Sequence, residues 1–156
     1  GVICDEEDWI DGVRDSKLVS KKKREDVAHD LRESVRYEIA EVSHRDVDRL
    51  GLTKSFTFAL RQIVQKMPCD IVVIDGNRLR GFGNKFHFQH KADRDVMSVA
   101  AASVIAKVYR DDIMIDFAKE FPEYGFDRHK GYASAEHRAC IGRIGPCAIH
   151  RRSFKL

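Results

Sequence analysis

The sequence predicts an α/β fold built as a single domain over residues 1–156. The apolar run at residues 71–74 indicates a buried strand, and patterns of helical spacing come before and after it. Strands that alternate with helices are typical of parallel crossovers, which define this fold class. A hydrophobic content of 43% in 156 residues is sufficient for one apolar core.

The chain opens with a short strand, followed by a helix. Residues 2–4 have the composition of a strand that is already under way, and the chain starts at Gly1, so we expect a fragment of a longer protein. Ser20 is the expected start of a helix whose apolar residues recur on one face, namely Val27, Leu31 and Val35. Alternating polar and apolar side chains then predict a strand over residues 37–42.

Two helices are predicted to follow this strand. Ser43 is the expected N-cap of a short helix over residues 44–49. Apolar residues at helical spacing predict a longer helix over residues 52–67, and Pro68 ends it because proline lacks the N–H that the helix needs.

The second half of the chain contains two predicted strands and a long helix. The strands cover residues 70–75 and 85–90, and the helix covers residues 95–119. The first half of that helix is apolar nearly all round, so we expect it to be buried. A last short helix is expected to start near Ser134.

Charge and cysteine content restrict the class of protein. The net charge is +3, and basic residues cluster at 21–24 and 150–155. These clusters could bind the phosphates of a nucleic-acid backbone, or they could be two solvent-exposed charged faces without a ligand. The charge pattern alone favours the second interpretation. No apolar run approaches the ~20 residues of a membrane-spanning helix. The four cysteines are scattered, which indicates free thiols in a reducing, cytoplasmic setting.

Two aspartates are expected to end neighbouring strands. Asp75 ends the apolar run, and Asp93 closes the next strand, just before the buried helix. A charge at the end of a buried strand costs free energy unless it is paired or coordinated. Two such carboxylates could supply oxygen ligands for Mg²⁺ or Mn²⁺. The alternative is structural: Asp75 would shape a turn, and Asp93 would cap a helix.

Other residues have weaker chemical signatures. Ser16 and Lys17 precede the basic helix, where a hydroxyl and an ammonium group can grip a phosphate. Tyr132 could stack on a sugar or base, or could simply pack in a surface loop. The acidic run at residues 5–8 is interpreted as solvated. Two cysteines and two histidines could form a zinc site, although their inner spacing is short for one: His137, Cys140, Cys147 and His150.

Five segments, taken together and in order, resemble ribonuclease HII. They are DSKLVSKKKRE (15–25), VVIDGNR (72–78), KAD with AAASVIAKVYRD (91–111), FPEYGFDRHKGYASAEH (121–137) and GPCAIHRRSF (145–154). The resemblance implies a ribonuclease H-like mixed sheet flanked by helices, with a small helical part from about residue 121 to 156. It implies an endonuclease that hydrolyses the RNA strand of RNA–DNA hybrids and nicks DNA 5′ to an embedded ribonucleotide. The products would carry a 3′-hydroxyl and a 5′-phosphate, and the cofactor would be Mg²⁺ or Mn²⁺.

The resemblance also implies roles for individual residues. Asp75 and Asp93 match the third and fourth metal-site acids of the family and would be catalytic, whereas Asp95 falls where the family is often basic. Tyr132 matches a tyrosine linked with sensing the RNA–DNA junction. The residues expected to hold nucleic acid are Ser16, Lys17, Tyr132, Arg151 and Arg152.

One family motif is absent from the chain. The family's first two acids lie in a DEAGRG-type motif on the first strand, and Asp5 and Glu6 do not replace it. We therefore expect that the first strand is missing and that the chain as given is weakly stable and cleaves poorly, while its parent protein is a working nuclease. The alternative function is a catalytically dead nucleic-acid-binding fragment of the same fold. We expect a cytoplasmic monomer without membrane association.

Overall fold

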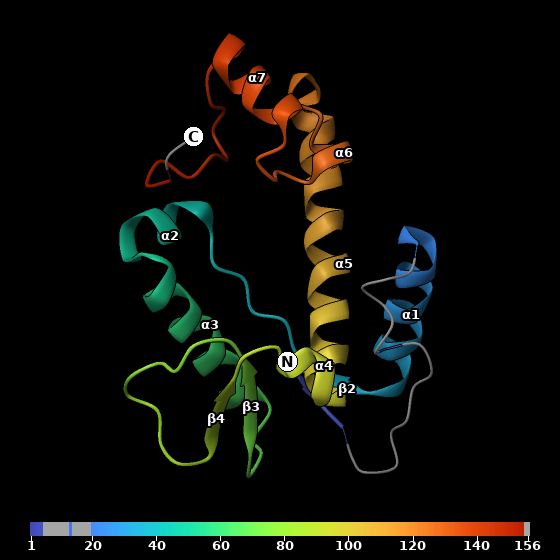
Figure 1. The fold of residues 1–156 in the computed structure, drawn as a ribbon, viewed down its shortest axis with the longest axis vertical. Helices are drawn as coiled ribbons and strands as arrows, with labels where there is room; N and C mark the ends of the chain where they lie inside the picture. Colours follow the sequence, from blue (N-terminus) through green and yellow to red (C-terminus); the bar gives the residue numbers. More distant parts are fainter. Residues whose placement is uncertain (5–12, 14–19, 155–156) are drawn as a thin grey trace. The chain divides into compact units, whose positions relative to one another are not determined.

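The structure is a computed structural model of the 156-residue chain, and it describes residues 1–4, 13 and 20–154 (Figure 1). Its contacts divide the chain into two compact units. The first comprises Gly1–Glu41 and Phe56–Val108, and the second comprises Val42–Ser55 and Tyr109–Leu156. Each unit has an apolar core of its own.

Helix α1 (Lys21–Ser34) begins where the sequence predicts. The hydroxyl of Ser20 accepts a hydrogen bond from the N–H of Lys23 at 3.3 Å and so caps the first turn. Ala28 and Leu31, both on the apolar face, have no exposed surface. This face therefore forms part of the core of the first unit.

Four short strands form two separate pairs within the described residues. β1 (Val2–Ile3) and β2 (Arg36–Tyr37) are antiparallel, whereas β3 (Val72–Asp75) and β4 (Phe86–Gln89) are parallel. The strand predicted over residues 37–42 is therefore wrong beyond Tyr37. The ladder ends with two hydrogen bonds between Gly1 and Glu38 at 2.8 and 3.0 Å, and residues 38–43 have no regular secondary structure.

The predicted long helix is present but interrupted near its start. The short helix α4 (Ala92–Asp95) is separated from α5 (Met97–Glu120) by Val96, whose backbone is extended with φ −114° and ψ 116°. The prediction that the first half of this helix is buried is confirmed. Its buried residues lie in the core of the first unit and include Ala100, Ala101, Val104, Ile105 and Val108.

Helices α2 (His44–Leu50) and α3 (Leu52–Lys66) also match their predictions. The hydroxyl of Ser43 accepts a hydrogen bond from the N–H of Asp46 at 3.1 Å, which confirms the predicted N-cap. Helix α3 ends two residues before Pro68.

Three short helices and a small core follow α5 in the second unit. The helices are the 3₁₀ helix η1 (Pro122–Tyr124), α6 (Phe126–His129) and α7 (Ala135–Ile144). The hydroxyl of Ser134 caps α7 by accepting the N–H of His137 at 3.1 Å, as the sequence predicts. The core contains Tyr124, Phe126 and Cys140. None of the helices in the described part of the chain is both long and apolar enough to span a membrane.

Candidate active site

Asp75 is the last residue of β3 and lies opposite Gln89 of β4. Gly76 extends this pairing by donating its N–H to the Gln89 carbonyl at 3.1 Å, and its φ of 131° turns the chain away from the sheet. Asp75 itself is exposed, and its Oδ1 accepts a hydrogen bond from the N–H of Ala92 at 3.2 Å. Its Oδ2 makes no hydrogen bond or ion pair within the described residues, so this oxygen is accessible to a ligand.

The expectation that Asp93 closes a strand is wrong, because β4 ends at Gln89 and Asp93 lies in the first turn of α4, where it is only 7% exposed. The N-cap of this helix is Lys91, in a left-handed conformation with φ 58°, so the alternative that Asp93 caps a helix is wrong. Asp95 is engaged elsewhere, because its Oδ2 accepts a hydrogen bond from Gln89 Nε2 at 2.9 Å. Asp93 is thus the inward-facing acid of this short helix.

The hydrogen bond between Asp75 and Ala92 brings the end of β3 against the residue next to Asp93. Both aspartates offer carboxylate oxygens, the ligands that hard divalent cations prefer. Mg²⁺ is usually held by one or two carboxylates together with waters and substrate phosphates, and this donor pair fits such a site. No group of three or more His, Cys, Asp or Glu side chains arranged for a metal ion occurs among the described residues.

Tyr132 belongs to the second unit and is 56% exposed. The guanidinium of Arg110, on α5, lies over the tyrosine ring at 4.7 Å from its centroid. The same guanidinium donates from Nη2 to the carbonyl of Lys130 at 2.7 Å. Lys130 and Gly131 are both left-handed, with φ 52° and 72°, and so redirect the chain between α6 and the tyrosine. Arg110 therefore supports both the ring and the turn that precedes it.

The basic C-terminal segment is attached to α2 through Asp48. The Asp48 carboxylate accepts hydrogen bonds from the Arg152 N–H at 2.7 Å and from the Ser153 N–H and hydroxyl at 2.9 and 2.6 Å. These bonds, with the Ser153 hydroxyl first, lower the pKa of Asp48 to about 2. Arg151 and Arg152 remain exposed, and the Arg151 guanidinium lies 3.7 Å from the centroid of the Phe154 ring. Asp48 thus fixes the backbone of this segment and leaves its guanidinium groups at the surface.

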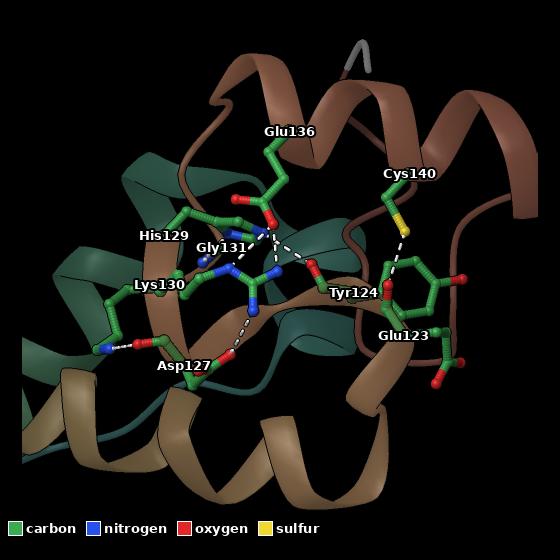
Figure 2. A network of polar contacts seen from close by, with 9 residues as sticks. Glu123, Tyr124, Asp127, His129, Lys130, Gly131, Glu136 and Cys140 are labelled. Carbon is green, nitrogen blue, oxygen red and sulfur yellow. Dashed lines mark hydrogen bonds and ion pairs between the residues drawn. The ribbon is translucent and has the colours of Figure 1, made fainter.

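The segment that leads to Tyr132 is held by the ring of His129, which Figure 2 shows between Tyr124 and Gly131. The N–H of Gly131 donates to His129 Nδ1 at 3.2 Å, so the ring proton is on Nε2. That nitrogen lies 2.8 Å from the carbonyl of Tyr124 and donates to it.

An ion pair and an internal lysine complete this network (Figure 2). Arg128 pairs with Glu136, which raises the pKa of the guanidinium and lowers that of the carboxyl. The ammonium of Lys130 donates to the carbonyl of Asp127. The turn before Tyr132 is therefore fixed from within the second unit.

The sequence model of the ribonuclease HII family matches residues 1–156. This chain belongs to the ribonuclease HII family. Ribonuclease HII of Caldicellulosiruptor bescii is 36% identical over 156 residues, which cover 98% of this chain and 76% of that protein. Ribonuclease HII of Francisella philomiragia is 37% identical over 158 residues, which cover 99% of this chain and 85% of that protein.

Solved structures show the same fold. Ribonuclease HII of Archaeoglobus fulgidus, determined in complex with PCNA, matches with a TM-score of 0.79 at 24% identity, over 93% of this chain and 79% of that one. Ribonuclease H2 of Pyrococcus horikoshii matches with a TM-score of 0.72 at 22% identity, over 92% of this chain and 77% of that one. The predicted α/β fold of the ribonuclease HII type is confirmed.

Membership of the ribonuclease HII family establishes the class of reaction that the chain catalyses. The chain is an endoribonuclease, a hydrolase that acts on RNA–DNA hybrids, and enzymes of this family are generally metal-dependent. Nothing in the comparisons favours the alternative of a catalytically dead fragment.

The predicted site residues fall into three groups in this ribonuclease HII chain. Asp75 and Asp93 are joined in the first unit through Ala92. Tyr132, Arg151 and Arg152 belong to the second unit. The acidic run at residues 5–8 lies outside the described residues, as do Ser16 and Lys17.

The residues considered as zinc ligands have other partners. His150 uses opposite edges of its ring: Nε2 lies 3.1 Å from His137 Nε2, and Nδ1 lies 3.0 Å from the Cys147 sulfur. The Cys140 thiol donates to the carbonyl of Glu123 at 3.1 Å. The four side chains therefore do not surround a common point, and the zinc interpretation is wrong.

Proposed function

We propose that this ribonuclease HII chain cuts the phosphodiester on the 5′ side of a ribonucleotide, both in RNA–DNA hybrids and in DNA that contains single ribonucleotides. The products carry a 3′-hydroxyl and a 5′-phosphate. Asp75 and Asp93 are catalytic as two ligands of Mg²⁺ or Mn²⁺. The hydrogen bond between the Ala92 N–H and Asp75 Oδ1 supports this most directly, because it ties one carboxylate to the neighbour of the other.

The environments of the two aspartates support complementary roles. Asp93 is buried, and an ionised carboxylate in that position costs free energy that an adjacent divalent cation lowers. Asp75 is exposed, with one oxygen fixed by Ala92 and the other open to a ligand. When bound, the cation lowers the pKa of a water molecule and polarises the scissile phosphate.

The exposed basic and aromatic residues would hold the substrate. Guanidinium groups bind phosphate oxygens through paired hydrogen bonds, and the backbone of the arginine segment is fixed by Asp48 before any ligand binds. The exposed Tyr132 ring can stack on a sugar or base at the RNA–DNA junction, with its hydroxyl directed to a 2′-hydroxyl. The residues proposed to contact the nucleic acid are Ser16, Lys17, Tyr132, Arg151 and Arg152.

We further propose that the protein is a cytoplasmic monomer. All four cysteines are free, as is usual for a protein in a reducing compartment. Sedimentation at micromolar concentration should show one species near the chain mass of 17.9 kDa, and a species of twice that mass would contradict the proposal.

Charge-removing substitutions test the catalytic assignment. Asp75→Asn keeps an oxygen that can accept the Ala92 N–H, so its stability should stay within about 0.5 kcal/mol of wild type. Cleavage of duplex DNA with one ribonucleotide should nevertheless fall at least ~100-fold, because removing a direct ligand should cost more than the ~10–100-fold loss seen for supporting residues. Asp93→Asn should behave alike, and calorimetric titration with Mn²⁺ should show weaker binding for both.

Asp70→Asn is the matched control, because Asp70 is an exposed aspartate just before the same strand. It should cleave at the wild-type rate. Cleavage by Asp75→Asn and Asp93→Asn at the rate of this control would overturn the assignment of the two aspartates.

A further inference from the structure

Three hydrogen bonds in series connect Cys147 to Tyr132 through two buried imidazole rings. The N–H of Cys147 donates to His150 Nδ1 at 3.0 Å, and the Nε2 atoms of His150 and His137 are 3.1 Å apart. His137 Nδ1 lies 2.9 Å from the carbonyl oxygen of Tyr132. His137 is 5% exposed and His150 is 8% exposed, so these bonds are formed away from solvent.

One arrangement of protons satisfies all three contacts when both rings are neutral. His150 Nδ1 accepts a backbone N–H, so the proton of His150 is on Nε2. That proton is donated to His137 Nε2, so the proton of His137 is on Nδ1 and is donated to the carbonyl of Tyr132. A second proton on either ring would place two N–H donors face to face.

The surroundings of the two rings oppose a positive charge. Both rings pack against Phe126, with centroids 5.5 and 5.7 Å away. Burial lowers the pKa of His137 and of His150, and the nearby His129 and Arg152 act in the same direction. The Cys147 thiol on the far side also favours its neutral form, because burial raises its pKa. The neutral pair is thus the stable state near neutral pH.

Tyr132 is held on several sides. Its N–H donates to the carbonyl of His129 at 2.9 Å, and its carbonyl accepts the N–H of Ser134 at 2.8 Å as well as His137 Nδ1–H. The guanidinium of Arg110 packs on its ring at 4.7 Å. The contacts from His137 and Arg110 are the parts of this support that a change of side chain can remove, and only the contact from His137 involves the carbonyl of Tyr132 itself.

We propose that His137 and His150 are positioning residues for Tyr132, and that their neutral hydrogen-bonded pair fixes the tyrosine for contact with the RNA–DNA junction. This inference rests on the proposed role of Tyr132. The relevant quantity is the junction ratio, defined as kcat/KM for duplex DNA with a single ribonucleotide divided by kcat/KM for a uniform RNA–DNA hybrid. Loss of positioning lowers the junction ratio, whereas a general loss of activity does not.

Two substitutions of His137 distinguish the contribution of Nδ1 from that of Nε2. Asparagine places an amide N–H₂ near the position of Nδ1 and can still donate to the Tyr132 carbonyl, whereas glutamine reaches the position of Nε2 and cannot. His137→Gln should therefore lower the junction ratio toward that of Tyr132→Ala, about tenfold, which is the worth of one hydrogen bond. His137→Asn should retain most of the wild-type junction ratio.

The tyrosine variants distinguish the two ways in which this reasoning can fail. An unchanged junction ratio in Tyr132→Ala would refute the proposed role of Tyr132 itself. A reduced ratio in Tyr132→Ala, together with equal ratios in His137→Asn and His137→Gln, would refute the positioning role alone. Far-UV circular dichroism of each variant checks that the fold is retained.

Nitrogen-15 NMR of the wild-type chain tests the geometry without any variant. Near pH 7, His150 should show its proton on Nε2 and His137 should show its proton on Nδ1. The reverse tautomers, or a doubly protonated ring at this pH, would overturn the inference even if all variants failed to fold.

Discussion

Replacing Phe126 by alanine should strongly destabilise the second unit. Phe126 is 1% exposed, and its ring stacks on Tyr124 with centroids 5.4 Å apart and an interplanar angle of 5°. It also meets the edge of His137 at 5.5 Å. Loss of a fully buried phenylalanine costs about 3–5 kcal/mol, because a cavity is left where the ring was. For a chain of this size that corresponds to a fall in Tm of roughly 6–20 °C.

Thermal melts followed by far-UV circular dichroism measure the effect. Phe58→Ala is the matched control, because it removes the same side chain from a residue that is 50% exposed on α3. The control should change the free energy of unfolding by less than about 1 kcal/mol. If Phe126→Ala had the same Tm as the control, the Phe126 ring would not be a main source of stability in this core.

Three further predictions concern pH and salt. Burial holds the pKa of His137 and His150 below the ordinary 6.5, so as the pH falls the unfolded chain binds protons before the folded chain does. The free energy of unfolding should therefore decrease as the pH drops below 6.5. Urea midpoints that do not change between about pH 7.5 and pH 5.5 would contradict this prediction. Asp48 has a pKa of about 2 against an ordinary 3.8, so its contribution is present above 3.8 and is lost as pH falls through 2. Asp48→Asn should therefore melt below wild type at neutral pH and match it near pH ~2. Equal melting at neutral pH would argue against a stabilising role for the hydrogen bonds from Arg152 and Ser153 to Asp48. Replacing Arg151 and Arg152 by alanine should reduce the slope of log affinity for a hybrid against log salt by roughly 1 per lost phosphate contact, and binding curves with an unchanged slope would exclude them from the interface.

The parts of the fold that the sequence predicts well depend on local interactions. Ser20, Ser43 and Ser134 each accept an N–H three residues ahead, so the start of a helix is encoded within one turn. Pro68 ends α3 for an equally local reason, because it has no N–H. The apolar run before Asp75 predicts a strand end, and the positions of Asp75 and Asp93 together with the resemblance indicate both as candidate acids.

The parts that the sequence predicts poorly depend on contacts between distant residues. The strand after Val35 pairs with Val2 and Ile3, which are distant in the sequence, and no local pattern reveals this partner. Asp48 and Arg152 are 104 residues apart, and no spacing rule connects them. Sequence spacing indicates His137 and His150 only as candidate zinc ligands, since it cannot show which ring edges face each other.

Lys130 is a buried cationic residue whose ammonium group does not face solvent. The residue is 8% exposed, and its ammonium is bound to a main-chain oxygen of Asp127 within the same turn. It therefore acts as an internal brace and releases no counterion when a polyanion approaches. A count of lysines and arginines made from the primary structure alone therefore overstates the number of side chains in this loop that can pair directly with a phosphate. Exchange of Lys130 for asparagine, which tolerates a left-handed backbone, would remove the brace without removing a phosphate contact.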